Sequence, residues 1–271
     1  MERMGGCMTL PARMDTGITT NPWGGWRSQT SARIALGRAG AAIPTDESLR
    51  FGWAHAMARD AIHAPLDAQT LRTHLQADGW DVLHACSQAD DRTQYLRRPD
   101  LGRQLRPDDA LQLRTQRGSA KAVDLCVVVG DGLSSLAVQR HAAPLLATLR
   151  PLLPLAWTLA PVVLVTQARV AVADEIGEIW GARLLVMLIG ERPGLSSPDS
   201  LGIYITHTPR RGCSDAERNC ISNVRPEGLS YAAAAHKLGW LLQQAVQLGA
   251  TGVALKDESS PVTVPGERLP P

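Results

Sequence analysis

The first half of the chain carries apolar residues at helical spacing and few strand-like runs. After Thr45, which begins a capping sequence with two acidic residues, Leu49, Trp53 and Met57 lie on approximately one helical face. Residues 66–78 predict a second helix, because leucines recur four positions apart within them and a glycine follows. The pattern therefore predicts a helical N-terminal half.

Between these helices and residue 121 the pattern is irregular. Residues 95–100 and 107–109 combine proline and aspartate with short polar runs, which is typical of connected turns. We therefore expect this half of the chain to be helical and irregular.

The pattern changes after residue 121 to apolar runs of strand length separated by helical stretches. Runs that are apolar on both faces and alternate with helices are typical of a largely parallel sheet covered by helices. The predicted fold class is α/β, Rossmann- or flavodoxin-like, preceded by a helical N-terminal domain. The expected strands are residues 123–129, 162–165, 184–189, 203–206 and 252–255, and the expected helices are residues 134–149, 174–180 and 230–248.

These patterns predict four parts of the chain. Residues 1–30 form an N-terminal arm without periodicity, residues 31–120 a helical domain, residues 121–258 the α/β domain and residues 259–271 a tail. Trp23 and Trp26 stand out in the arm. Exposed tryptophans are often interface anchors, and local packing onto the same chain is the alternative.

Composition narrows the class of protein. The 271 residues are 44% apolar, and the 28 basic and 26 acidic residues are interspersed, so no charged surface for nucleic acid stands out. No stretch has the roughly 18 uncharged apolar residues that a membrane span needs, and the first twenty residues lack a continuous apolar segment. Five cysteines without a CxxC pair argue against a disulfide framework and a zinc site. We expect a protein of the cytoplasm.

Three polar loops follow predicted strands, at residues 130–135, 166–170 and 189–202, and the first and third contain glycine. Loops at the carboxyl ends of strands in an α/β sheet converge on one edge, where helix N-termini offer free backbone N–H groups. None contains a nucleotide-binding motif, because GDG is neither GxGxxG nor a P-loop. The loops therefore predict a ligand site of unstated chemistry.

Single residues in these loops allow two interpretations each. Asp131 suits a general base or polar anchor, although an aspartate before Ser134-Ser135 is more typical of a helix cap. Glu191 suits an acceptor for a ligand amide or an exposed charge in a turn. Residues alone do not decide between them.

Cys220 lies in a dense polar stretch before the last predicted helix. As a nucleophile it would need a neighbouring base, for which His207 and His236 are the candidates, but no cysteine-enzyme signature surrounds it. A buried, inert thiol is the favoured interpretation.

Several stretches resemble the small (light) subunit of ethanolamine ammonia-lyase, the adenosylcobalamin-dependent enzyme that converts ethanolamine to acetaldehyde and ammonia. The resemblance covers roughly residues 20–258. Its most specific parts are ARIALGRAG (32–40), FGWAHAMARDA (51–61), YLRRPDLG (95–102), GDGLSS (130–135), GERPGLSSPDSLG (190–202), DAERNC (215–220) and LKD (255–257).

The resemblance implies a cofactor, a partner and three site residues. It implies that Val170, Glu191 and Cys220 contact base-on adenosylcobalamin, and that the chain forms a hetero-oligomer with a large subunit that handles ethanolamine. It assigns no catalytic acid or base and no metal ligand to this chain, and the Asp-x-His-x-x-Gly motif of some other cobalamin enzymes is absent. It also implies a bacterial microcompartment as an alternative to the open cytoplasm.

Two other interpretations remain at this point. The first is an autonomous α/β protein that binds a nucleotide or other small ligand without an obligate partner. The second is a cysteine hydrolase that uses Cys220 as its nucleophile.

Overall fold

The computed structural model describes residues 17–259, and its contacts divide the chain into one compact unit up to Ala56 and a second from Met57. The predicted domain boundaries at residues 30, 120 and 258 stay a prediction. The parts of the predicted arm and tail at residues 1–16 and 260–271, with Cys7, lie outside the described residues.

The first unit has short elements and almost no interior. Strands β1 (Ile18–Thr19) and β2 (Arg38–Ala39) pair antiparallel, a 3₁₀ turn η1 (Pro22–Ser28) lies between them in sequence, and α1 (Thr45–His63) begins in this unit. Within residues 17–56, Pro44 and Glu47 are the buried residues. Glu47 is held by Arg27 at 2.7 Å and Arg50 at 3.3 Å. This unit therefore has no apolar core of its own among the described residues.

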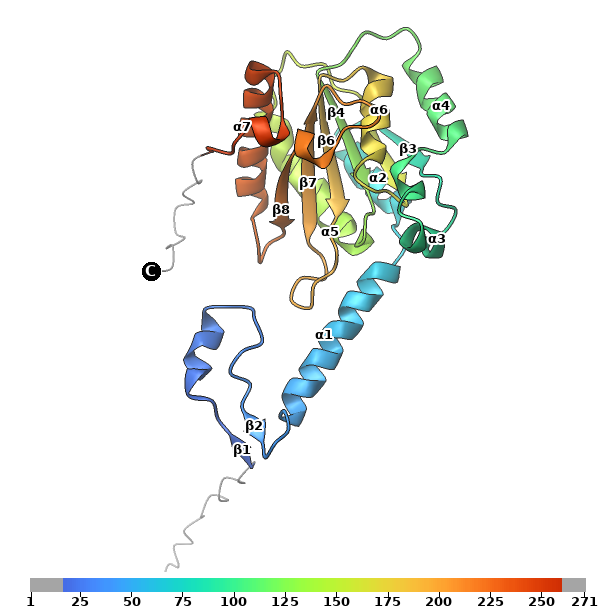
Figure 1. Ribbon diagram of the computed structural model, residues 1–271. Helices are drawn as coiled ribbons and strands as arrows, with labels where there is room; N and C mark the ends of the chain where they lie inside the picture. The colour runs from blue at the N-terminus through green and yellow to red at the C-terminus, as the bar shows by residue number, and fades with distance from the viewer. Residues whose placement is uncertain (1–16, 260–271) are drawn as a thin grey trace, which may run out of the picture. The chain divides into compact units, whose positions relative to one another are not determined.

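The second unit is built on a six-stranded sheet in the order β3-β5-β4-β6-β7-β8, shown in Figure 1. The pairs β3·β5, β5·β4 and β4·β6 are parallel, whereas β7 and β8 continue the sheet antiparallel. The strands are β3 (Val82–Cys86), β4 (Leu125–Gly130), β5 (Val162–Thr166), β6 (Leu184–Gly190), β7 (Leu201–His207) and β8 (Arg218–Val224).

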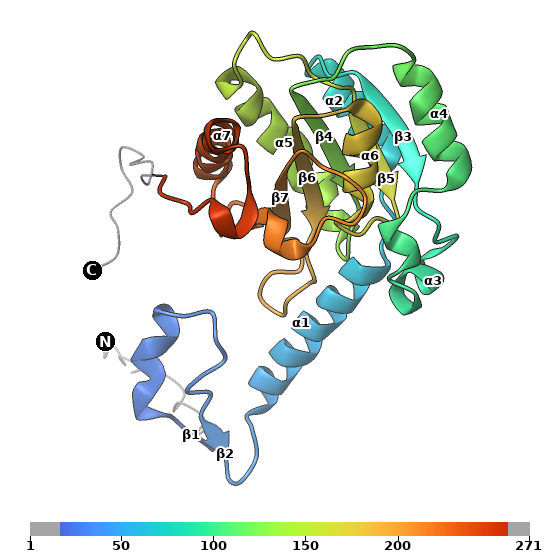
Figure 2. The same cartoon turned by 45° about the horizontal axis from the view of Figure 1, so that its top comes forward.

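Helices cover both faces of this sheet, as Figures 1 and 2 show. Helices α2, α5 and α7 bury their apolar residues against one face, and α4 and α6 pack on the other, so that each face has its own core. The helices are α2 (Ala68–Ala77), α3 (Arg92–Arg97), α4 (Pro107–Arg117), α5 (Ser135–Leu149), α6 (Val172–Trp180) and α7 (Tyr231–Leu248), with 3₁₀ turns η2 (Leu101–Arg103), η3 (Arg150–Leu152), η4 (Asp215–Glu217) and η5 (Gly252–Ala254). The predicted α/β class, with a largely parallel sheet and covering helices, is confirmed.

Three strand predictions were wrong or missing. Strands β3 and β8 were not predicted from the sequence, and the strand expected at residues 252–255 is the 3₁₀ turn η5. Gly252 has a φ of +74°, which a strand cannot accommodate. Strand β3 places part of the region expected to be helical inside the sheet.

Two segments expected to be turns are helical. Residues 107–109 begin α4, with proline at the first helical position and two aspartates in the first turn. Both features favour a helix start, because proline there loses no hydrogen bond and the carboxylates complement the helix dipole. Residues 95–97 lie in the short helix α3.

Candidate functional site

A cavity of about 420 Å³ opens where the loops after β4, β5 and β6 meet. All three loops that the sequence analysis singled out contribute to it. Its lining residues are Tyr95, Gly132, Leu133, Arg169, Val170, Ile189, Gly190, Glu191, Arg192 and Tyr204. This volume lies within the range of small-molecule pockets, and the lining combines apolar residues with two arginines, one glutamate and two tyrosines.

Two glycines make the close packing of these loops possible. The N–H of Leu133 donates to the carbonyl of Gly190 at 2.9 Å, so two backbone segments lie in direct contact. A Cβ atom on Gly190 would overlap the carbonyl of Ser134, and one on Gly132, whose φ is +58°, would overlap the carbonyl of Gly190. Part of the cavity is therefore formed by backbone that tolerates no side chain.

Asp131 ties two loops together and does not cap α5. Its carboxylate accepts the backbone N–H of Ala168 at 2.8 Å and of Gln167 at 3.0 Å, and Arg92 lies 3.5 Å away. Burial raises the pKa of Asp131, although these donors favour the carboxylate. The helix cap is Ser134, which accepts the N–H of Ala137, so the favoured sequence interpretation of Asp131 was wrong.

Tyr95 lies between two guanidinium groups. Its ring is 4.3 Å from Arg169 and 4.7 Å from Arg92, and its hydroxyl donates to the carbonyl of Ala168 at 2.9 Å. Burial raises the pKa of Tyr95, so the hydroxyl stays a donor at neutral pH. Sequence reasoning missed this stack, although Tyr95 begins one of the quoted family motifs and Arg169 precedes Val170.

Val170 and Glu191 come from different loops and line the same cavity. The N–H of Glu191 donates to the carbonyl of Ser200 at 2.9 Å, and its carboxylate accepts from the Ser200 hydroxyl and from the N–H of Asn223, 3.4 Å away. The carboxylate is thus held in place and is partly buried, which argues against the interpretation of Glu191 as a free charge in a turn.

Cys220 lies on β8, beside the cavity and outside its lining. It pairs across the sheet with Tyr204, which does line the cavity. Burial, with the neighbouring Cys220 and Glu191, raises the pKa of Tyr204 to about 12. The Cys220 thiol is exposed, 3.4 Å from the Ser222 hydroxyl, so the expectation of a buried thiol was wrong.

The two candidate bases for Cys220 lie elsewhere. His207 ends β7 opposite Leu184, whereas Cys220 pairs with Tyr204, and the His207 ring contacts Thr208 at 3.0 Å. His236 is an exposed residue of α7. Among residues 17–259 no histidine contact to Cys220 is found, and the thiol has no partner that would generate a nucleophilic thiolate.

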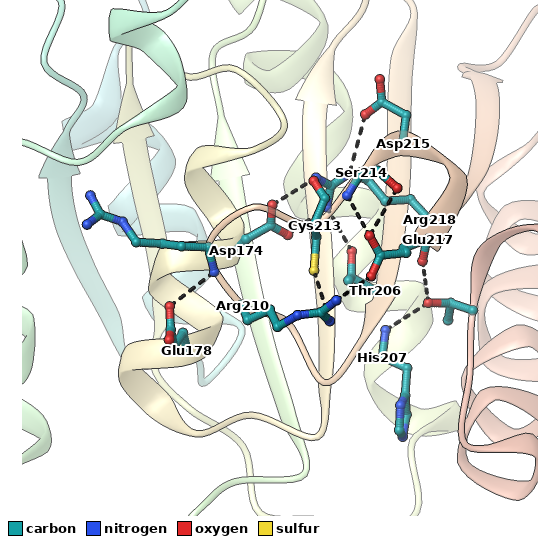
Figure 3. A network of polar contacts seen from close by, with 12 residues as sticks. Asp174, Glu178, Thr206, His207, Arg210, Cys213, Ser214, Asp215, Glu217 and Arg218 are labelled. Carbon is teal, nitrogen blue, oxygen red and sulfur yellow. Dashed lines mark hydrogen bonds and ion pairs between the residues drawn. The ribbon is translucent and has the colours of Figure 1, made fainter.

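A buried ion pair fixes the strand that carries Cys220, as Figure 3 shows. Arg218 donates to both carboxylate oxygens of Asp174, at 2.6 and 2.8 Å, and to the carbonyl of Cys213 at 2.7 Å. The two side chains are 2% and 1% exposed. Because Asp174 lies on α6, shortly after Val170, this pair joins the helix that follows Val170 to the strand that carries Cys220.

The long loop that follows Glu191 is anchored to α5. The Ser134 hydroxyl donates to the carbonyl of Pro198 at 2.8 Å, and Arg140 donates to Asp199 at 2.8 Å. His141 lies 3.6 Å from Asp199 through Nε2, and its Nδ1 is 2.7 Å from the hydroxyl of Tyr231. The loop is therefore tied to α5, and His141 links that helix to Tyr231 of α7.

Comparison with known proteins gives one consistent family. The family model for the ethanolamine ammonia-lyase light chain matches residues 20–256. The chain is 58% identical over 252 residues to the ethanolamine ammonia-lyase small subunit of Azotobacter vinelandii, covering 92% of this chain and 93% of that one. It is 55% identical to the protein of that name from Ralstonia nicotianae, with 93% and 94% covered, and 54% identical to that from Pseudomonas putida, with 94% and 95% covered.

Proposed function

This chain belongs to the ethanolamine ammonia-lyase light-chain family, and we propose that it is the small subunit of an enzyme that converts ethanolamine to acetaldehyde and ammonia. The observation that carries the site is that Val170 and Glu191, from two separate loops, line one cavity beside the strand of Cys220. These are the positions that the family resemblance implies for cofactor contact.

The cofactor in this proposal is base-on adenosylcobalamin. Its cobalt–carbon bond, when broken homolytically, supplies the organic radical of the reaction. The residues of the cavity fit such a group, because Arg169, which lines it, has a buried Nε without a hydrogen-bond partner in the described structure. Unpaired buried polar atoms are costly, and a polar ligand that reaches them would relieve that cost.

Glu191 has the capacity to bind a peripheral amide of the corrin. A carboxylate offers about four lone-pair positions, and the Ser200 hydroxyl and the Asn223 N–H leave part of that capacity free. Leu133 and Ile189 supply apolar walls that exclude water. This chain therefore binds and orients the cofactor, and in the proposal it contributes no acid or base to the chemistry.

The size of the cavity supports the proposal that a partner subunit completes the cofactor site. A volume of about 420 Å³ suits a drug-sized ligand, and a cobalamin is much larger. The cavity can therefore hold only part of the cofactor. In the proposal the large subunit of a hetero-oligomer covers the rest and carries the residues that handle ethanolamine.

The test is deamination of ethanolamine with adenosylcobalamin, first with this chain alone and then after mixing with a large subunit. Activity that appears only on mixing supports the proposal. Failure to form a complex, together with binding of a small ligand by this chain alone, would favour an autonomous α/β binding protein.

Cys220→Ala separates cofactor contact from nucleophilic catalysis. As a cofactor contact, Cys220 predicts weaker adenosylcobalamin binding with turnover restored at saturating cofactor. Loss of turnover at every cofactor concentration, in a variant that still binds cofactor, would instead make Cys220 a nucleophile. Thr115→Ala, at an exposed position of α4 away from the cavity lining, is the control.

We propose the cytoplasm as the location, with a bacterial microcompartment as the alternative. No helix in residues 17–259 is long and apolar enough to cross a membrane. Fusion of residues 1–30 or of residues 259–271 to a fluorescent reporter tests the alternative: a diffuse signal in cells that form microcompartments excludes an address in these tails.

A further inference from the structure

Arg169 is a cation in the cavity wall without an acidic partner. Within residues 17–259, the acidic groups near the cavity are already engaged: Asp131 lies against Arg92, and Glu191 accepts from Ser200 and Asn223. No ion pair of Arg169 is found in this described part of the chain. Arg192 lines the same cavity and adds a second positive charge.

The Arg169 side chain is held in one orientation. Its backbone N–H donates to the carbonyl of Gly102 at 2.8 Å, its Nη2 donates to the carbonyl of Tyr95 at 3.4 Å, and its guanidinium stacks on the Tyr95 ring. A Cβ atom on Gly102 would lie 2.9 Å from Cγ of Arg169, so the glycine provides the space for this side chain. An ordered arginine loses little entropy when it binds a ligand.

One nitrogen of this ordered group has nothing to bind. Arg169 Nε is buried and has no hydrogen-bond partner in the described residues. A partly buried guanidinium without a counter-charge is unfavourable, and stacking on an aromatic ring offsets only part of that cost. An oxyanion that enters the cavity would supply both the charge and the acceptor, and the planar guanidinium suits a phosphate group in particular.

We propose that Arg169 binds the phosphodiester of the cofactor's nucleotide loop. This inference rests on the proposed function, in which adenosylcobalamin occupies this cavity. The peripheral side chains of the corrin are neutral amides, whereas the phosphodiester carries a negative charge, so it is the group of the cofactor that a positive cavity wall selects. Arg169 would thereby make the site specific for a corrinoid with a complete nucleotide loop.

The test compares two corrinoids on the complex with the large subunit. Adenosylcobalamin and adenosylcobinamide, which lacks the nucleotide loop and its phosphate, are titrated by optical absorbance against the wild type and Arg169→Gln. We expect the variant to bind adenosylcobalamin about 10- to 100-fold more weakly and adenosylcobinamide with unchanged affinity. Arg72→Gln, an exposed arginine of α2, is the matched control and should change neither affinity.

Three outcomes would overturn the inference. Equal losses for both corrinoids would show that Arg169 only supports the cavity wall. Unchanged binding of adenosylcobalamin by Arg169→Gln would show that Arg169 does not contact the phosphodiester. A complex that assembles less tightly without any corrinoid would show that Arg169 pairs with a carboxylate of the large subunit.

A second variant covers the case in which Arg169→Gln disturbs folding. Arg169→Lys keeps the charge but loses the planar fork, so its loss for adenosylcobalamin should be smaller than that of Arg169→Gln. If the wild-type complex binds neither corrinoid, the proposed function itself fails, which is a different result from any outcome for Arg169.

Discussion

The two units of the chain place their apolar side chains in opposite environments. In the α/β unit, Leu146 and Leu164 are at most 1% exposed. In the first unit, Trp23 is 64%, Leu49 69% and Trp53 71% exposed. Leu49 and Trp53 of α1 recur at helical spacing, as do the apolar residues of the α/β helices, so a periodic pattern predicts which residues share a face but not what that face contacts.

This difference indicates different sources of stability. The α/β unit buries an apolar layer on each side of its sheet and can fold on its own core. Contiguous exposed apolar groups on a soluble protein usually mark an interaction surface. We therefore expect the first unit, and with it Trp23 and Trp26, to contribute to association with the large subunit.

The largest expected loss of stability is in the α/β unit, where Arg218 and Asp174 form a buried ion pair. Arg218→Ala leaves a carboxylate buried without its partner, which should lower the free energy of unfolding by about 3–5 kcal/mol. Denaturant unfolding measures it. Arg210→Ala, whose side chain is 59% exposed, is the control and should cost under about 1 kcal/mol.

A double variant tests whether the unpaired buried charge causes the loss of stability in Arg218→Ala. Asp174→Leu combined with Arg218→Met replaces the pair by apolar groups, and it should recover most of the stability that Arg218→Ala loses. A double variant as unstable as the single one would show that the other bonds of Arg218, to the Cys213 carbonyl and Thr206, matter more than the charge.

The same substitution in both units tests the comparison directly. Leu146→Ala removes a fully buried side chain of α5 and should cost about 2–5 kcal/mol in the free energy of unfolding. Leu49→Ala removes an exposed side chain of α1 and should change it by no more than about 0.5 kcal/mol. Similar losses at both positions would contradict the assignment of an interior to one unit only.

The affinity of the chain for the large subunit tests whether the exposed apolar side chains of the first unit form an interface. Trp53→Ala should weaken association with the large subunit by about 2 kcal/mol while leaving the stability of the isolated chain unchanged. Leu155→Ala removes a fully exposed leucine of the α/β unit and serves as the comparison. If the two variants weaken assembly equally, exposure alone would not distinguish the two units.

The smallest expected effect is a gradual pH dependence centred on His141. Burial lowers its pKa from the usual 6.5, and the nearby Asp199 opposes this shift, with Arg140 and Tyr231 also facing the ring. A lowered pKa means that the unfolded chain binds the proton first. The contribution of His141 to the free energy of unfolding is therefore complete above the pKa that His141 has in the unfolded chain. It is lost as pH falls through the pKa that His141 has in the folded chain.

His141→Gln should flatten this dependence. Unfolding free energies measured between about pH 7.5 and pH 5 should fall less steeply in the variant. Burial lowers the pKa of His207 as well, so part of the slope should remain. An unchanged slope would assign the whole effect to groups other than His141.

The central strands could be predicted because they are buried on both faces. Strands β4, β5 and β6 are nearly continuous apolar runs, and the sequence analysis found all of them. Strand β8 (Arg218–Val224) was missed because an edge strand needs apolar residues on one side only, and here Ile221 and Val224 supply them among polar residues. Its antiparallel neighbour β7 follows a connection without a helix, a signal that argues against a parallel crossover.

The loops that form the cavity could be predicted from the sequence, but the side-chain contacts that hold those loops in place could not. Polar loops after three strands, two of them containing glycine, marked the cavity, and the resemblance supplied Val170 and Glu191. Arg169 and Tyr95 are 74 positions apart and meet only in the folded chain. No local pattern encodes such a meeting, because it depends on where α3 lies against the loop after β5.

The contact between Gly132 and Gly190 limits how this cavity can be redesigned. Because its floor there is main chain, a library that randomises these two positions should return glycine almost exclusively. Altered ligand selectivity would have to come from the walls, where Leu133, Val170 and Arg192 present side chains. The main chain at Gly132 and Gly190 is thus a fixed part of the cavity, whereas directed evolution can act on the side chains of its walls.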